Sequence, residues 1–231
     1  EDGDEIKQHI EQFLLSVPRL SKVITASTLV EKRLINWNID PNLIVKIPLG
    51  VNTKIFMPTR LETKNEIRKR LNIPKEAILI GSFQKDGMGW KSGFKPKLIK
   101  GPDIFVNTLK ILSEKGYPIH VLLTGPARGY VIENLKLNNI SYHHDYVSRS
   151  EDLVTFYQAL DIYLITSREE GGPLGLMESM SCGVPVVTTN VGMARDVITD
   201  KDVGEISSEI CAHELAERVE KLIKLNLKEK N

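Results

Sequence analysis

Predicted strands and predicted helices alternate along most of this chain, and the connections between them are short. Segments rich in apolar and β-branched residues, typical of buried strands, are followed by segments with a helical spacing of apolar residues. This alternation predicts an α/β fold in which a parallel sheet is covered by helices on both faces. The predicted strands are residues 22–27, 43–50, 77–83, 119–125, 140–146, 161–167 and 185–190. The predicted helices are residues 5–16, 28–37, 62–72, 102–114, 130–137, 150–159, 173–182 and 212–228.

The segment VNTKIFMPTR (51–60) interrupts this alternation, and Pro58 breaks any regular element there. At 231 residues the chain can hold one large domain or two modest ones. We therefore predict a domain boundary near residue 50, with residues 51–231 forming the larger domain.

Charge and cysteine content exclude several classes of protein. The chain has 31 basic and 30 acidic residues, so its net charge of +1 gives no electrostatic footprint for nucleic acid. Cys182 and Cys211 form no CxxC pair, which argues against structural zinc or a disulfide framework. Such sparse cysteines are typical of a reducing compartment, and we expect a cytoplasmic protein.

Three loops that follow predicted strands are rich in special residues. The first, residues 83–101, carries five lysines, and the others are TGPARG (124–129) and SREEGGPLG (167–175). In a parallel sheet the carboxyl ends of the strands meet at one edge, which is where ligands bind. Lysine ammonium groups, together with the backbone amides of residues 172–175 at a helix start, would suit a diphosphate. The five lysines are Lys85, Lys91, Lys95, Lys97 and Lys100.

Two carboxylates beside this predicted anion site require a second kind of ligand surface. Glu170 precedes the glycines and Glu178 follows eight positions later, so both would repel a bare diphosphate. Vicinal hydroxyls of a ribose or a hexose, however, donate hydrogen bonds that a carboxylate accepts. The combination indicates a nucleotide sugar, in which a diphosphate joins two sugars. Glu169 is expected to be a solvated charge in the first turn of the helix.

The segment from Ser167 to Pro185 resembles the donor-site signature of retaining glycosyltransferases of family 4, which have the GT-B fold. The matching positions are Ser167, Glu170-Gly171 and Glu178, followed by SMSCGVPVV. The segments IPLGVNTKIFMP, LIKGPDIFVNTLKIL and VLLTGPAR resemble further parts of the same family. The resemblance implies a Rossmann-like donor domain over residues 51–231. It also implies that residues 1–50 are the tail end of the N-terminal acceptor domain and the interdomain linker.

The resemblance also implies roles for individual residues. Glu170 would lie near the hydroxyls of the donor sugar, Glu178 would bind the ribose, and Lys100 would contact the diphosphate. Glu170 and Lys100 are thereby the expected catalytic residues. The other expected donor-binding residues are Lys85, Gly125, Tyr146, Val147, Gly171, Gly172, Pro173 and Leu174. Where the family often has Gly-Phe-Gly after the first glutamate, this chain has Gly-Gly-Pro, which leaves the sugar open.

The function implied is transfer of a hexose-type sugar from a UDP-, GDP- or ADP-linked donor to a glycan, lipid or other acceptor. The anomeric configuration would be retained, with no metal and no cofactor. Because the reaction of GT-B enzymes takes place between two domains, we expect no efficient transfer by this chain alone. Peripheral membrane association through the missing N-terminal domain is possible. The alternative is a non-catalytic nucleotide-sugar-binding or regulatory module, whereas a dehydrogenase is disfavoured because no GxGxxG follows a strand.

Several conspicuous residues are expected to have structural roles only. His143 and His144 would point to opposite faces of a strand, one packed and one exposed. Cys182 is expected to be a small buried packing residue. Trp37 and Trp90 are both expected to be half-buried.

Overall fold

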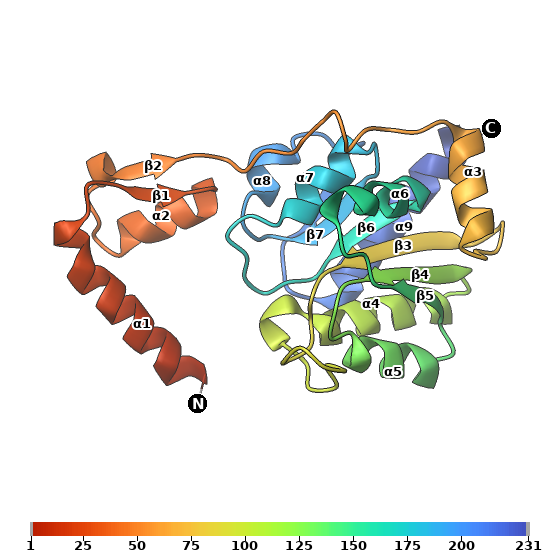
Figure 1. The fold of residues 1–231 in the computed structure, drawn as a ribbon, viewed down its shortest axis with the longest axis horizontal. Coiled ribbons are helices and arrows are strands. Elements are labelled where there is room, and N and C mark those ends of the chain that lie inside the picture. The colour runs from red at the N-terminus through yellow and green to blue at the C-terminus, as the bar shows by residue number, and fades with distance from the viewer. Residues whose placement is uncertain (1, 230–231) are drawn as a thin grey trace.

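All six strands of the main sheet run parallel, as the alternation of strands and helices predicts. The computed structural model describes residues 2–229, and its strand order in this sheet is β5-β4-β3-β6-β7-β8 (Figure 1). The strands are β3 (Ile78–Phe83), β4 (Ile119–Thr124), β5 (Ser141–Asp145), β6 (Ile162–Ile165), β7 (Val186–Thr189) and β8 (Gly204–Ser207).

Helices cover both faces of this sheet, which confirms the predicted fold class. Side chains of successive strand residues alternate between two cores, so Ile80 joins one hydrophobic cluster and Leu79 the other. The first cluster is closed by α4 (Pro102–Glu114), α5 (Gly129–Leu137) and α9 (Ala212–Glu229). The second is closed by α3 (Leu61–Arg70), α6 (Leu153–Ala159), α7 (Leu174–Ser181) and α8 (Ala194–Val197). Cys182 is buried in the second cluster, as predicted, and burial raises its pKa to about 12.

The sheet differs from the prediction mainly at its edge. Strand β8 was not predicted, because its four residues GEIS include a glycine and a charged residue and give no apolar alternation. Glu205 in β8 is nevertheless buried, since Arg218 and Lys221 of α9 pair with its carboxylate. Helix α6 also starts later than predicted, because residues Ser150–Asp152 form a 3-10 turn.

Residues 2–46 form a smaller unit around a two-stranded parallel sheet (Figure 1). It contains α1 (Asp2–Ser16), β1 (Val23–Thr25), α2 (Thr28–Asn36) and β2 (Ile44–Lys46), with 3-10 helices at Val17–Arg19 and Pro41–Leu43. Ser27 caps α2 by accepting a hydrogen bond from the amide of Val30. The predicted strand 43–50 ends at Lys46, because its partner β1 has only three residues.

An irregular connection, residues 47–60, joins this smaller unit to the main sheet (Figure 1). The two parts also contact each other directly, since the backbone amide of Thr28 donates to Asp196 Oδ2 over 3.0 Å. A domain boundary near residue 50 stays a prediction. None of the helices within residues 2–229 combines the length and the apolar character that crossing a bilayer requires.

Candidate functional site

The strand order reverses between β3 and β6, and the loops that follow these two strands lie side by side. The chain runs outward from β3 to β4 and β5, then returns to β6 on the other side of β3. In open parallel sheets such a switch point is the usual place for a ligand. The residues that follow β3 and β6 include the lysines and the glutamates that the sequence singles out.

Gly101 allows the two loops to approach closely. Its φ is 62°, and a Cβ at this position would lie 1.8 Å from the carbonyl oxygen of Thr166, so no other residue fits. Thr166 Oγ1 donates to the carbonyl of Gly101 over 2.8 Å. Arg168 in turn makes two hydrogen bonds, of 2.8 and 2.7 Å, to the carboxylate of Asp103, and these lower the Asp103 pKa. These contacts bring Lys100 next to Glu170.

A cavity of about 430 Å³, here called the switch-point cavity, opens between these loops. It is lined by Phe83, Gln84 and Lys100 from the β3 side, and by Tyr163 and Ile165 of β6. The remaining lining residues are Leu153, Glu170, Gly172, Pro173, Leu174, Gly175 and Glu178. Six of the residues predicted to bind the donor therefore surround one cavity, namely Lys100, Glu170, Gly172, Pro173, Leu174 and Glu178.

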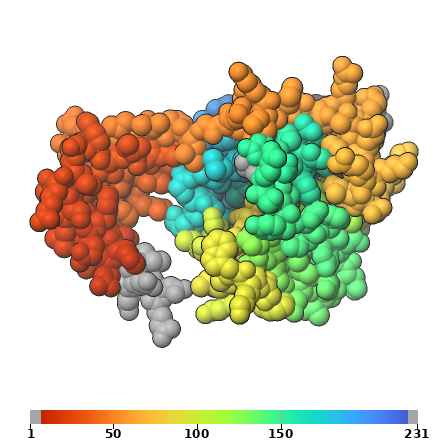
Figure 2. All heavy atoms as spheres, viewed as in Figure 1, coloured from red at the N-terminus to blue at the C-terminus, as the bar shows by residue number. Residues whose placement is uncertain are grey.

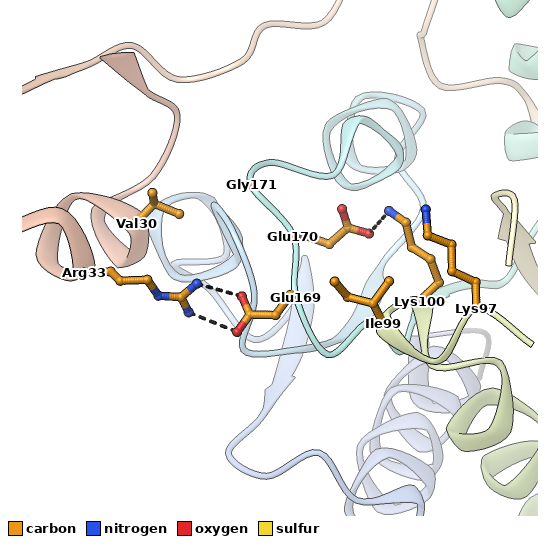
Figure 3. Close-up of a pocket in the computed structure, with 8 residues that line it drawn as sticks. All are labelled: Val30, Arg33, Lys97, Ile99, Lys100, Glu169, Glu170 and Gly171. Atoms are coloured by element: carbon orange, nitrogen blue, oxygen red, sulfur yellow. Dashed lines mark hydrogen bonds and ion pairs between the residues drawn. The ribbon is translucent and has the colours of Figure 1, made fainter. Parts of the chain in front are cut away.

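Lys100 and Glu170, the two residues predicted to be catalytic, form an ion pair at this cavity. Nζ of Lys100 lies 2.5 Å from Oε1 of Glu170 (Figure 3). The same carboxylate accepts a hydrogen bond of 2.9 Å from the hydroxyl of Ser167. Figure 3 shows Lys97 pointing in the same direction as Lys100, so two ammonium groups approach the site from one loop. Lysine ammonium groups carry three donors, so Lys100 can hold Glu170 and an anion together.

Glu178 is held by a buried tyrosine that the sequence did not indicate. The hydroxyl of Tyr157 donates to Oε2 of Glu178 over 2.8 Å. Burial raises the pKa of Glu178, and the hydrogen bond from Tyr157 opposes that rise. Burial also raises the pKa of Tyr163 to about 12, so this neighbouring phenol stays neutral. Gly175 lies against both tyrosines, because a Cβ there would meet the Tyr163 oxygen at 2.5 Å and the Tyr157 oxygen at 3.0 Å.

Backbone amides without hydrogen-bond partners lie at the start of α7, as the Gly-Gly-Pro sequence predicts. Pro173 precedes the helix and has no amide hydrogen. Within the described chain, the amides of Gly172, Leu174 and Gly175 have no hydrogen-bond partner. Such amides at the N-terminal end of a helix attract anions.

Five of the predicted donor-binding residues, Gly171 among them, do not line this cavity. Tyr146 and Val147 follow β5, two strands away from the switch point, and Gly125 follows β4. Lys85 places its ammonium group 3.6 Å above the ring of Trp90. Trp90 is itself exposed rather than half-buried as predicted, whereas Trp37 is half-buried. His143 is partly buried and His144 exposed, as predicted for the two faces of a strand.

A second cavity of about 400 Å³, the adjoining cavity, shares Lys100 and Glu170 with the first (Figure 3). It extends towards α2 and includes Gly171, the last of the predicted glycines. On its far wall, Arg33 of α2 makes two hydrogen bonds to Glu169, of 3.0 and 3.1 Å. The expectation for Glu169 is therefore wrong, because this residue lies five positions before α7 and pairs with an arginine from the smaller unit.

Arg128, which the sequence did not indicate either, fixes the loop that carries the lysines. Its fully buried guanidinium lies 3.1 Å from Asp86, which is also fully buried. The guanidinium donates to the carbonyl oxygens of Ser82, Gln84 and Thr124. Burial raises the pKa of Asp86, and the charge of Arg128 opposes that rise. An arginine in TGPARG looks like an ordinary loop residue in the sequence, so only the fold reveals this role.

Among the described side chains, residues 7–149 and 151–225, no three His, Cys, Asp or Glu residues gather closely enough to hold a metal ion.

Two solved structures share this architecture. A glycosyltransferase from Rickettsia africae has a TM-score of 0.70 and 21% identity, and the match covers 89% of this chain and 54% of that one. Anabaena HepE, solved in complex with UDP-glucose, has a TM-score of 0.71 and 20% identity, over 90% of this chain and 55% of that one. These similarities establish the GT-B glycosyltransferase fold for the region that they cover.

Curated relatives share more of the sequence. The D-inositol 3-phosphate glycosyltransferase of Xylanimonas cellulosilytica is 27% identical over 176 residues, 71% of this chain and 39% of that protein. The O-antigen biosynthesis glycosyltransferase WclY of Escherichia coli is 31% identical over 133 residues, 55% of this chain and 33% of that protein. The chain thus spans less than half the length of these relatives. The family model "Glycosyl transferases group 1" matches residues 93–231. The chain therefore belongs to the glycosyl transferases group 1 family.

Proposed function

We propose that this chain binds a nucleotide-diphosphate sugar in the switch-point cavity and supplies the donor half of a glycosyltransferase site. The observation that carries the proposal is the meeting of Lys100, Glu170 and Glu178 around one cavity, together with the free backbone amides of Gly172, Leu174 and Gly175. The amides and Lys100 suit the diphosphate, and the two carboxylates suit sugar hydroxyls. Anabaena HepE, which has the same fold, was solved with UDP-glucose, and this supports the choice of ligand.

The charges of the cavity fit the requirement of glycosyl transfer. As the bond between the anomeric carbon and the diphosphate oxygen breaks, negative charge develops on the departing diphosphate. Lysine ammonium groups and fixed amides stabilise such charge because they are already oriented towards it. Lys100, with Lys97 beside it, would take this role without a metal ion. Glu170, partly neutralised by Lys100 and Ser167, would orient the hydroxyls of the transferred sugar.

Two finer features belong to the same proposal. The anomeric configuration is retained, with the acceptor oxygen bonding on the face that the diphosphate leaves and the acceptor proton passing to the departing oxygen. The donor carries a hexose-type sugar on UDP, GDP or ADP, and the acceptor is a glycan, a lipid or another hydroxyl compound. Location in the cytoplasm stays a prediction.

Two experiments test this proposal. Calorimetric titration of the chain with UDP-, GDP- and ADP-glucose and with GDP-mannose is expected to show binding of at least one donor, also in the presence of EDTA. Binding of none of them would contradict the proposal. The polypeptide that includes the N-terminal half is expected to form a product with the anomeric configuration of its donor, measured by NMR. Donor binding without transfer by that longer polypeptide would instead support a regulatory module.

A further inference from the structure

The loop of residues 84–100, here called the basic loop, exposes apolar side chains that the proposed donor site does not use. The exposed fractions are 81% for Trp90, 55% for Phe94 and Leu98, and 49% for Met88. Trp90 has the highest exposed fraction among the large hydrophobic residues of the described chain. Figure 2 shows the atoms of this loop, in yellow, at the surface of the molecule. Clustered apolar exposure of this kind is typical of a surface that binds a partner.

The charged side chains that the basic loop exposes to solvent are all positive. It contains five lysines and a single acidic residue, Asp86, which is fully buried against Arg128. Lys100 pairs with Glu170 at the candidate site and is not counted as part of the exposed surface of the loop. The other four, Lys85, Lys91, Lys95 and Lys97, form no ion pair with the side chains that the structure describes, residues 7–149 and 151–225. Lys85 instead lies over one face of the Trp90 ring, so a positive charge and an exposed aromatic side chain are next to each other.

The loop is a fixed structure and holds these side chains outward. Two hydrogen bonds between its arms close it, from Met88 N to Lys95 O over 2.8 Å and from Lys97 N to Asp86 O over 2.7 Å. Its tip is bound to the start of α5, where the amide of Gly129 donates to Ser92 O over 2.7 Å. Because the backbone is already ordered, little conformational entropy is lost when the exposed side chains enter a partner surface.

We propose that the basic loop binds the surface of a membrane that contains anionic lipids. Tryptophan and lysine are favoured where the apolar interior of a bilayer meets water, and aliphatic residues such as Met88 and Leu98 add apolar surface for insertion. Lysines near an anionic leaflet are attracted to it electrostatically. Single-stranded nucleic acids bind through bases that stack on aromatic rings, and aliphatic side chains do not provide such stacking. The exposed Met88 and Leu98 therefore favour a membrane over a nucleic acid as the partner.

Membrane binding by the basic loop would serve the proposed transfer reaction, because the end of this loop lines the adjoining cavity. Its final residues, Lys97, Ile99 and Lys100, line the adjoining cavity, so a membrane bound at Trp90 and Phe94 would lie close to the candidate site. An acceptor carried by a lipid could then reach the donor without leaving the membrane. This consequence rests on the proposed function, whereas lipid binding by the loop does not.

Vesicle binding by the 231-residue chain tests the proposal. We expect co-sedimentation with vesicles of phosphatidylcholine and phosphatidylserine, and much less with phosphatidylcholine alone. In a Trp37→Phe background, the fluorescence of Trp90 is expected to shift to shorter wavelength on binding. Lys91→Gln with Lys95→Gln is expected to weaken binding roughly 25-fold, since each lysine near the surface contributes about a fivefold factor. Trp90→Ser with Phe94→Ser is expected to abolish the co-sedimentation.

Matched variants identify the surface. Lys54→Gln with Lys75→Gln makes the same change in net charge at exposed lysines outside the loop, and Leu137→Ser removes an exposed leucine of α5. Both are expected to bind vesicles like the unchanged chain. Failure to bind anionic vesicles, or binding that the loop variants do not weaken, would overturn the proposal. So would loop-dependent binding of a single-stranded oligonucleotide without vesicle binding. Donor titration of the same variants separates a failure of this proposal from a failure of the donor site.

Discussion

The phenol of Tyr157 and the carboxylate of Glu178 share a hydrogen bond of 2.8 Å beside the switch-point cavity. The sequence singles out Glu178 as a ligand for ribose, but the tyrosine that orients it lies 21 positions earlier, in another helix. Burial by itself would favour the protonated carboxyl of Glu178, and the bond from Tyr157 counteracts this. The ionised form is the one that accepts hydrogen bonds from two hydroxyls.

Tyr157→Phe is therefore expected to raise the pKa of Glu178 and to make donor binding more sensitive to acid. Because Glu178 must be ionised, binding is lost as the pH falls through its pKa, and the midpoint should move to higher pH in the variant. Calorimetric titration across the acidic range measures this. Tyr142→Phe, in β5, is the control. A midpoint that is the same in both variants would show that Tyr157 does not act on Glu178.

Arg128→Met is expected to lower the free energy of unfolding by about 3–5 kcal/mol, because it leaves Asp86 as an unpaired buried charge. The comparison is Arg168→Met, which breaks the partly exposed pair with Asp103 and is expected to cost only about 1 kcal/mol. Denaturant unfolding measures both. An equal cost for the two variants would mean that the Arg128–Asp86 pair does not fix the basic loop.

His120 is expected to make stability depend on pH. It is buried on β4, and neither ring nitrogen has a hydrogen-bond partner in the described chain. Burial lowers its pKa in the folded protein, so the unfolded chain binds more protons below about pH 6.5. Stability is therefore lost as the pH falls from that value through the folded pKa. His120→Leu should flatten the acid side of the stability curve measured by denaturant unfolding, and an unchanged curve would contradict this role of His120.

Replacement of the adjacent residues Glu169 and Glu170 is expected to have different effects on donor binding. Glu170→Ala should weaken donor binding by at least about tenfold, as expected when a hydrogen-bonding charge is lost. Glu169→Ala removes only the exposed pair with Arg33, so it should leave donor affinity unchanged and alter stability by no more than about 1 kcal/mol. Titration of both variants with the same donor checks this, and a larger effect at Glu169 would reverse the assignment.

The sequence predicts the main sheet well because its interior strands are apolar on both faces. β3, β4, β6 and β7 are all found where continuous apolar segments place them. β8 escapes prediction because its buried Glu205 depends on Arg218 and Lys221 from a distant helix. Local patterns carry no information about such partners.

In the candidate site, too, local sequence patterns reveal some residues, whereas contacts between distant segments stay hidden. Glu170, Glu178 and the glycines lie in one segment with a recognisable spacing, and Lys100 lies directly before the Gly101 that brings it to them. Tyr157 and Arg128 could not be predicted, since they act through contacts that only the fold creates. The expected position of Trp90 was wrong because a tryptophan in a loop gives no sign of whether the loop covers it.

Titration of Lys100→Ala and Glu178→Ala with the donor that binds best tests the central claim most directly. Lys91→Ala, in the same loop but outside both cavities, is the control. If the ammonium group of Lys100 binds the diphosphate and Glu178 binds the ribose, each of the first two changes should weaken affinity by about tenfold or more, while the control does not. Affinity unchanged by Lys100→Ala and by Glu178→Ala would contradict the account.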